Sequence, residues 1–381
     1  MLWFVCFFNY ADRQAIFAVF PVLEKEFGFD KQQLGLIGSA FMWVYAAGAP
    51  FAGWVCDRFT RKTLILGGCF FWSLVTVMTG WCSKLWHFVT VRALEGFGET
   101  FYFPASMSLV SDYHGPQTRS RAMSLHQSSV YVGTILGSWL GAWIAERWGW
   151  RVGFYLFGGA GMLLSIVLFR YLVEPARGRA EPTTNTVGTV STRESITDVF
   201  REPAAWMLLL AFVCANFVAT IFLTWTPTFL VQKFGFKLAA AGLSGTVFIH
   251  AASAFAVPIA GLAADRCARF VGGGRVLPQI AGLVIGAGFV ALVGGTDARG
   301  TLILAMTVFG ICKGFYDAGI FATLYDVVPA RSRGTAAGVM NTVGWTGGAL
   351  GPVLTGWYAK TGPHGSDMAN MSVFIQWCGL A

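Results

Sequence analysis

Long apolar stretches alternate with short polar loops along almost the whole chain. A helix that crosses a bilayer needs about 20 predominantly apolar residues. By this measure the sequence predicts twelve spanning helices, near residues 1–21, 33–56, 62–82, 86–111, 119–145, 150–173, 204–232, 239–264, 275–295, 300–327, 332–358 and 369–381. The pattern is typical of an all-α membrane protein, whose backbone polar groups are satisfied inside each helix.

One long polar stretch interrupts this pattern. Residues 174–203 are rich in Pro, Thr and Arg, and they separate the first six predicted helices from the last six. We therefore predict three parts. They are an N-terminal six-helix bundle over residues 1–173, a cytoplasmic linker over 174–203 and a C-terminal six-helix bundle over 204–381.

A nine-residue motif occurs once in each half. Residues 50–58 and 258–266 both read P-x-A-G-x-x-x-D-R, each at the end of an apolar stretch and before a short basic turn. A second repeated sequence is Arg-Ser-Arg, which occurs at 119–121 and at 331–333. Each copy lies at the start of a predicted glycine-rich helix. Many membrane transporters consist of two similar halves with the substrate path between them. The repeats therefore predict two pseudo-symmetric six-helix halves.

Composition supports the membrane interpretation. The chain is 55% hydrophobic and only 12% charged, whereas soluble domains carry about 25% charged residues. The net charge of +8 does not indicate nucleic-acid binding, because the Lys and Arg residues lie in short loops and form no basic face. The eight cysteines lack a C-x-x-C spacing, and no nucleophile motif, phosphate-binding loop or zinc spacing occurs. We expect no enzyme activity, no cofactor and no metal site.

Lys and Arg are unevenly distributed between the two sets of loops. With the N-terminus in the cytoplasm, the inside loops hold 15 of these residues and the outside loops hold nine. Cytoplasmic loops of membrane proteins carry an excess of Lys and Arg. The bias predicts a multi-pass protein of the cell membrane with both termini in the cytoplasm. We expect it to be a monomer in the lipid bilayer.

Ionisable residues occur inside two predicted spans of the first half. At about 1.5 Å per residue, Asp12 lies ~16 Å from the chain start and Glu99 lies ~20 Å beyond Trp86. Both positions are near the middle of a ~30 Å hydrocarbon core. Arg92, Glu95 and Glu99 share one helix face, because they are spaced three and four residues apart. A charge at this depth costs ~2.5–3.5 kcal/mol even on a lenient scale, so these groups face a wet cavity or one another.

These side chains suggest anion transport coupled to protons. A carboxylate at mid-depth can take up and release a proton, and the planar fork of arginine binds a carboxylate or phosphate through two hydrogen bonds. We predict that Asp12 and Glu99 carry the coupling proton and that Arg13 and Arg92 bind a small organic anion. The alternative is a set of fixed ion pairs, with Asp12 neutralising an arginine of the fourth span.

A second charged pair lies in the tenth predicted span. Lys313 and Asp317 are four residues apart, so they could pair with each other or belong to the substrate site together with Tyr316, and we slightly favour the site. Other polar residues could line the cavity or form interhelical hydrogen bonds: Tyr10, Tyr45, Tyr102, Gln127, Asn216 and Asn341. His126 and His250 are single histidines within apolar spans, for which we expect packing or polar bridging.

One loop resembles a motif of the major facilitator superfamily. Gly53-x-x-x-Asp57-Arg58-x-x-Arg61-Lys62 is similar to the loop motif between the second and third helices of that superfamily. Asp265-Arg266 is a weaker second copy. The resemblance implies twelve spanning helices in two halves that rock against each other in alternating access. It also implies gating residues, which hold the inside gate closed when the cavity faces outward: Gly53, Asp57, Arg58, Arg61, Asp265 and Arg266.

Residues 9–13, 92–104 and 223–230 resemble one branch of the superfamily, the anion:cation symporters, which carry sugar acids and other organic anions together with protons. The Spinster lysolipid and sphingolipid transporters share the Asp12-Arg13 pair, the glutamate at 99 and an ending like residues 174–178. Lys313 and Asp317 depart from both branches. We expect proton-coupled symport of a sugar acid or other carboxylate. The alternatives are a Spinster-like proton-coupled lipid transporter and a non-transporting membrane receptor on the same fold.

Overall fold

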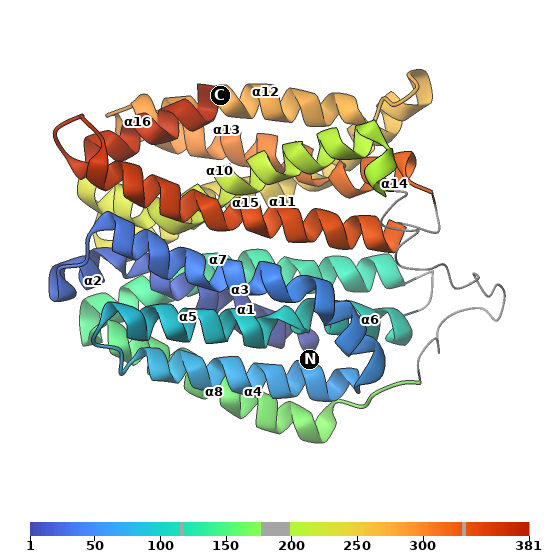
Figure 1. The fold of residues 1–381 in the computed structure, drawn as a ribbon, viewed down its shortest axis with the longest axis horizontal. Coiled ribbons are helices and arrows are strands. Elements are labelled where there is room, and N and C mark those ends of the chain that lie inside the picture. The colour runs from blue at the N-terminus through green and yellow to red at the C-terminus, as the bar shows by residue number, and fades with distance from the viewer. Residues whose placement is uncertain (115–117, 177–198, 330–332, 381) are drawn as a thin grey trace. The chain divides into compact units, whose positions relative to one another are not determined.

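The computed structural model describes residues 1–114, 118–176, 199–329 and 333–380, apart from the side chains at 53, 54, 57, 119, 120, 333 and 334. The ordered elements of this described part are helices (Figure 1). They are α1 (Leu2–Ala18), α2 (Phe20–Phe27), α3 (Lys31–Arg58), α4 (Arg61–Thr79), α5 (Leu85–Thr100), α6 (Tyr102–Tyr113), α7 (Arg119–Trp148), α8 (Trp150–Tyr171), α10 (Pro203–Phe234), α11 (Leu238–Phe270), α12 (Val276–Gly295), α13 (Arg299–Asp317), α14 (Ile320–Val327), α15 (Arg333–Thr361) and α16 (Asp367–Leu380).

Each of the twelve predicted spans coincides with one helix or with two consecutive helices, so the predicted all-α architecture is confirmed. By length and composition alone, seven stretches of the described chain are apolar enough to cross a membrane. They are Lys31–Ala52, Arg61–Thr79, Trp150–Tyr171, Pro203–Phe234, Leu238–Phe270, Val276–Gly295 and Arg299–Val327. Helices α1 and α5, of 17 and 16 residues, carry Asp12, Arg13, Arg92, Glu95 and Glu99, which are all buried.

Three of the predicted spans are broken, which the sequence pattern did not indicate. The span at 1–21 breaks at Val19, the span at 86–111 breaks at Phe101, and the span at 300–327 breaks after Asp317. Proline explains the first two breaks, because it lacks an N–H and its ring clashes with the carbonyl four residues earlier. Pro21 lies in the first turn of α2, and Pro104 lies in the first turn of α6. The second and third breaks place Glu99 and Asp317 close to a helix end.

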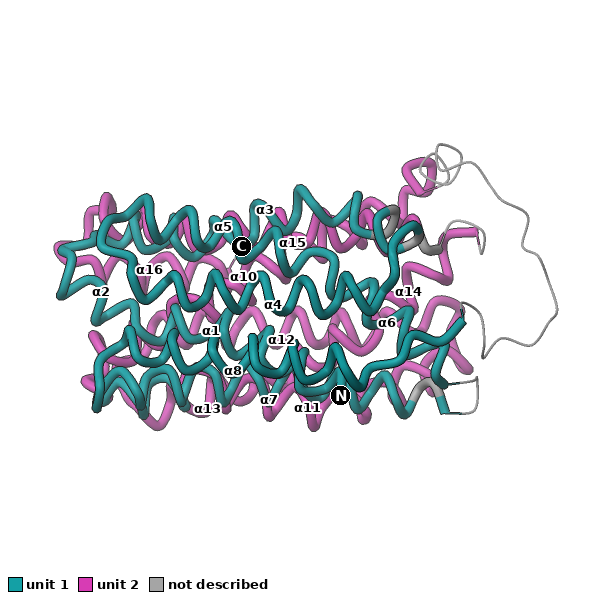
Figure 2. Tube along the Cα trace, turned by 90° about the horizontal axis from the view of Figure 1, so that it is seen from below, with its two compact units in different colours: residues 1–186, 237–243 teal, residues 187–236, 244–381 magenta. Residues whose placement is uncertain are grey.

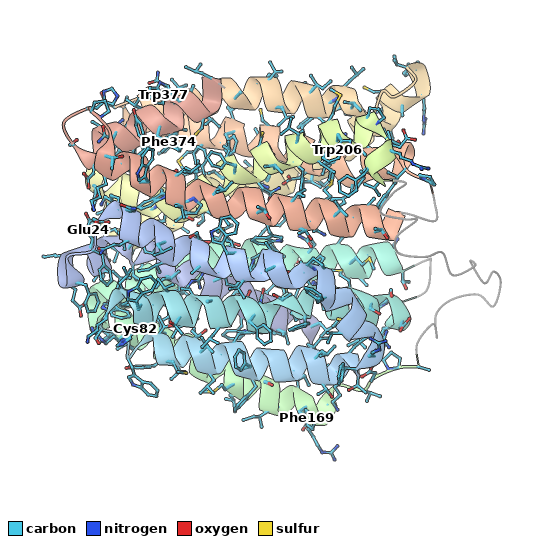
Figure 3. The ribbon with its side chains drawn as sticks, viewed as in Figure 1. Glu24, Cys82, Phe169, Trp206, Phe374 and Trp377 are labelled. Carbon is cyan, nitrogen blue, oxygen red and sulfur yellow. The ribbon has the colours of Figure 1, made fainter. Side chains whose placement is uncertain are left out.

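The chain forms two compact units (Figure 2). Unit 1 comprises residues 1–186 and 237–243, and unit 2 comprises residues 187–236 and 244–381. The predicted linker at 174–203 falls largely on residues 177–198, which lie outside the described residues, so the predicted domain boundaries stay a prediction. Within unit 1, Glu24 and Cys82 lie at one end, whereas Phe169 lies toward the other (Figure 3).

The same helix pairs pack together in each unit. In unit 1, α1 packs against α7 and α4 packs against α8; in unit 2, α10 packs against α15 and α12 packs against α16. Glycines make these approaches possible. A Cβ at Gly137 of α7 would lie 2.3 Å from the Cα of Ala11, and a Cβ at Gly347 of α15 would lie 2.6 Å from the carbonyl oxygen of Val213. Small residues at helix contacts are expected in a membrane, where lipid gives helices no hydrophobic drive to associate.

Candidate functional site

A cluster of five charged side chains lies inside unit 1. Asp12 and Arg13 come from α1, and Arg92, Glu95 and Glu99 come from α5. All five are buried, with Asp12, Arg92 and Glu99 each only 1% exposed. The sequence prediction that these groups meet in the interior is therefore correct for α1 and α5. Desolvated charges are costly unless they are paired, so the pairing within the cluster decides what it can do.

Arg13 is paired with Glu99. Its Nε donates to Glu99 Oε2 at 3.1 Å, and its Nη2 donates to the same oxygen and to Asn9 Oδ1 at 3.3 Å. Aromatic rings surround the guanidinium, with Phe41 at 4.4 Å and Tyr45 at 5.7 Å from its central carbon. Tyr45 thus lies at the predicted site through its ring.

Arg92 is only partly paired. Its Nη1 donates to Glu95 Oε2 one turn further along α5. Its Nε and Nη2 have no hydrogen-bond partner in the described part of the chain. The rings of Phe41 and Phe17 lie 5.1 Å and 5.6 Å from the guanidinium carbon. Phe41 therefore contacts both arginines, and Arg92 keeps free donor groups in an apolar surrounding.

Among the described residues Asp12 forms no ion pair with an arginine, whereas the alternative from the sequence paired Asp12 with an arginine of the fourth span. Arg13 is paired with Glu99 and Arg92 with Glu95. Among the described residues, Asp12 Oδ2 accepts a single long hydrogen bond of 3.4 Å from Thr76 Oγ1. Asp12 Oδ1 and Glu99 Oε1 have no partner among the described residues. Three carboxylates thus share this interior with two guanidinium groups.

The predicted residues of unit 2 divide into a pair and two separate side chains. Lys313 Nζ donates to Asp317 Oδ2 within α13, and these side chains are 21% and 32% exposed. Tyr316 is buried, and its hydroxyl has no partner in the described chain. Asn341 is half-buried on α15. In unit 1, Gln127 is exposed on α7 and makes no side-chain hydrogen bond within the described residues.

The gating motif of unit 1 centres on Arg61. The side chains of Gly53 and Asp57 lie outside the described residues, and Arg58 is exposed. Arg61 begins α4 and is buried; its Nη1 donates to Asp112 near the end of α6. Its Nε donates to Glu174 Oε1 at 3.2 Å. Arg61 therefore joins the start of α4 to the end of α6 and to the segment after α8.

Glu174 caps the first turn of α4. Its two carboxylate oxygens accept the backbone N–H groups of Arg61 at 2.9 Å and Lys62 at 3.0 Å. Partial burial on its own raises the pKa of Glu174, but these N–H groups and the Arg61 guanidinium together hold the pKa below its ordinary value of 4.5. Helix N-termini bind anions for the same reason, because their N–H groups lack partners inside the helix.

Unit 2 repeats this arrangement with residues that sequence reasoning missed. Arg275, at the start of α12, donates from Nη1 to both oxygens of Asp326 at 3.0 and 2.9 Å, near the end of α14. Its Nη2 lies 3.7 Å from Asp265 Oδ1. Arg266 belongs to the same turn of α11 and is exposed. Aligning the two halves helix by helix would have identified Arg275 and Asp326 as the counterparts of Arg61 and Asp112, since α4 corresponds to α12 and α6 to α14.

Other proteins are similar to this chain in sequence and in fold. A sequence profile of the Major Facilitator Superfamily matches residues 2–352. The probable galactarate/D-glucarate transporter GudP of Bacillus subtilis is 26% identical over 94% of this chain and 84% of its own length. The chloroplastic probable anion transporter 4 of rice is 28% identical over 94% of this chain, which spans 63% of that protein.

A solved structure shows the same fold at low identity. The crystal structure of a bacterial homolog of the human lysosomal transporter Spinster superposes with a TM-score of 0.82 at 23% identity. The superposition covers 94% of this chain and 81% of that one. The apolar helices and the profile match over nearly the whole sequence agree with it. The chain therefore belongs to the Major Facilitator Superfamily and is a multi-pass membrane protein of the transporter type.

Proposed function

We propose that the protein is a proton-coupled symporter that moves a small organic anion, a sugar acid or other carboxylate, by alternating access. The observation that carries this proposal is the unfilled fork of Arg92. Nε and Nη2 of one guanidinium are the pair of donors that grips a carboxylate in bidentate geometry. In the described chain both are buried and lack a partner. The names of the relatives from Bacillus subtilis and rice support an anionic substrate.

Charge balance supports the proton. Asp12, Glu95 and Glu99 outnumber Arg13 and Arg92 in the cluster, so full ionisation leaves one negative charge without a counter-ion in a desolvated interior. Such a charge is costly, and a bound proton removes the cost. An arriving anion adds another negative charge and favours a further proton. In this proposal Asp12 and Glu99 carry the coupled protons, while Arg13 exchanges partners as Glu99 changes charge.

The remaining predicted residues take supporting roles in the proposal. Additional substrate contacts come from Tyr45, Gln127, Lys313, Tyr316, Asp317 and Asn341. The proposed gate residues are Gly53, Asp57, Arg58, Arg61, Asp265 and Arg266. We add Asp112, Arg275 and Asp326 to this proposal because they form ion pairs at the same helix ends. The protein acts as a monomer in the cell membrane with both termini in the cytoplasm.

The experiment uses radiolabelled D-glucarate and purified protein in liposomes, with and without an imposed pH gradient. Asp12→Asn and Glu99→Gln should abolish accumulation driven by the gradient. They should leave counterflow exchange measurable, because exchange need not move a proton. Glu26→Gln serves as the matched control, since Glu26 pairs with Arg151 away from the cluster. Gradient-driven accumulation in both variants at wild-type levels would refute the coupling assignment.

Two further functions are outcomes of the same assay. A panel of other sugar acids and a neutral lysolipid is titrated against the protein in parallel. A neutral lysolipid that binds as tightly as any anion supports a Spinster-like lipid transporter instead. Ligand binding without flux of any panel member supports a receptor on the same fold.

A further inference from the structure

Unit 1 contains a buried polar pair that the proposed coupling does not use. Tyr102 begins α6 and His126 lies on α7, and they are 2% and 3% exposed. Tyr102 Oη lies 3.1 Å from His126 Nε2. His126 Nδ1 has no hydrogen-bond partner in the described part of the chain. Because buried polar groups are almost always satisfied, an unsatisfied imidazole nitrogen points to a function or to water at this place.

The Tyr102 hydroxyl has a choice of acceptors. It lies 3.2 Å from the carbonyl oxygen of Leu2 as well as within reach of His126 Nε2. A neutral imidazole with its hydrogen on Nδ1 leaves Nε2 free to accept. The single hydroxyl hydrogen can then turn from Leu2 to His126 without any movement of the backbone. This geometry allows a proton to be transferred through the Tyr102 hydroxyl to His126 Nε2, and it does not require one fixed hydrogen bond.

Side chains of α1 lie close both to this pair and to the charged cluster. Cys6 lies in the same buried core as Tyr102, and Tyr10 packs against that core. The Tyr10 ring lies 4.6 Å from the Arg13 guanidinium carbon. Cys6, Tyr10 and Arg13 are spaced four and three residues apart, so they lie on one face of α1. Glu99, whose Oε1 lacks a partner among the described residues, precedes Tyr102 by a single turn across the break after α5.

His126 also lines a cavity of about 610 Å³ inside unit 1. The ends of α1, α6, α7 and α8 form its walls, with Trp3, Val110, His114, Arg121 and Tyr171 among the lining residues. A space of this size with polar groups in its wall admits water. His126 therefore borders a space that water can enter.

We propose that Tyr102 and His126 relay the coupled proton between Glu99 and this cavity. The proposal rests on the proposed proton coupling. A proton released by Glu99 reaches Tyr102 Oη through water, and the hydroxyl passes its own hydrogen to His126 Nε2. The imidazolium gives its Nδ1 hydrogen to water in the cavity. Water then takes up the Nε2 hydrogen and returns a hydrogen to Nδ1, which restores the starting tautomer without net transfer. One proton enters, one leaves, and only O–H and N–H bonds change.

Few ionisable groups surround this pair in the described chain. Cys6 of α1 and Cys69 of α4 face Tyr102. His126 faces the amino group of Met1, and His114 and Arg121 line the cavity beside it. None of these is a carboxylate that would fix His126 as a permanent imidazolium.

The test measures three quantities for each variant in liposomes that contain a trapped pH dye. They are D-glucarate uptake driven by a pH gradient, acidification of the lumen during uptake, and counterflow exchange. Tyr102→Phe and His126→Gln should slow driven uptake and acidification by about a hundredfold or more, the lower end of what a positioned proton-transfer group contributes. Exchange should change far less, which also shows that the variants are folded. Tyr155→Phe and His87→Gln are the matched controls: Tyr155 donates to the Gly80 carbonyl, and His87 is exposed at the start of α5.

The outcomes separate the relay from the proposed function. Wild-type protein that takes up D-glucarate without acidification overturns the proposed coupling and the relay together. Normal acidification in wild type and in both relay variants overturns the relay alone. Equal losses of driven uptake and exchange assign Tyr102 and His126 to structure and overturn the relay as well.

Discussion

The two buried arginines of unit 1 differ in how fully they are paired. Arg13 donates to Glu99 through two nitrogens and to Asn9 through one. Arg92 holds Glu95 through Nη1 and leaves Nε and Nη2 without partners among the described residues. In an apolar environment a buried donor without an acceptor costs free energy. A ligand that accepts its hydrogen bond removes this cost and binds more tightly. Arg92 is therefore the better candidate of the two arginines for binding the substrate.

Arg92→Lys tests this difference directly. Lysine keeps the charge but loses the planar fork. Binding of D-glucarate should weaken by about 1.5–3 kcal/mol, the value of a hydrogen bond to a charged group. The measurement is a thermal-shift titration, with Arg151→Lys at the surface pair with Glu26 as the control. An unchanged affinity would make Arg92 a structural counter-ion of Glu95.

Glu174 predicts a pH dependence of stability. Its pKa in the folded protein lies below the ordinary value of 4.5. A carboxylate of this kind stabilises the fold above its unfolded pKa, and the contribution is lost as the pH falls through the folded pKa. Glu174→Gln should cost about 1 kcal/mol at pH 7, since the group is partly exposed. That corresponds to a Tm about 2–4 °C below wild type.

The measurement for Glu174 is the Tm of both proteins in detergent from pH 7 downward. The gap between wild type and variant should be constant down to the ordinary pKa and should close below it. A gap that persists unchanged in acid would show that the carboxylate charge contributes nothing and that the side chain acts by packing.

At the scale of elements, the broken helices matter most. Helices α5 and α6 meet at Phe101, and α13 and α14 meet at Ala318 and Gly319. In each unit the break follows shortly after a charged group, and an arginine holds the far end of the second helix. Arg61 holds the end of α6 through Asp112, and Arg275 holds the end of α14 through Asp326. A broken helix with both ends held can bend at the break without unfolding, which suits a segment that must respond to a change of charge.

Lys313 and Asp317 test whether the break in unit 2 belongs to the site. Each single neutral variant, Lys313→Met or Asp317→Asn, leaves one charge without its partner and should lower both stability and transport. In the double variant the Tm should return toward wild type. We expect transport of D-glucarate to stay lost in the double variant, because we propose that both groups belong to the substrate site. Transport at the wild-type rate in the double variant would return the pair to a structural role.

At the scale of the whole molecule, the repeat is the dominant feature. Corresponding helices pair in the two units, and corresponding arginines join corresponding helices. The positive charges of the loops predict the orientation of this arrangement in the membrane. Lys84, between α4 and α5, is predicted to lie outside, whereas Arg170, near the end of α8, is predicted to lie inside.

Cysteine labelling in intact cells tests the orientation. Lys84→Cys should react with a membrane-impermeant maleimide, whereas Arg170→Cys should react only after the membrane is permeabilised. The two positions are both exposed and both replace a cation, so each is the control for the other. Wild-type protein measures the background from the native cysteines. Labelling of Arg170→Cys from outside would invert the predicted topology.

The sequence by itself determined the helices, the repeat and the membrane class, because apolar length and periodic motifs are local properties that need no partner. It also predicted that Asp12 and Glu99 lie near the middle of the hydrocarbon core, since rise per residue converts position into depth. Pairing could not be determined in this way. Whether Arg13 meets Asp12 or Glu99 depends on how α1 and α5 are each rotated about their axes, and the packing of Gly96 of α5 against the backbone of Phe41 of α3 helps to fix the rotation of α5. Only the tertiary structure decided that, among the described residues, Asp12 forms no ion pair with an arginine and Arg92 keeps two donors without partners, and that Arg275 repeats the role of Arg61.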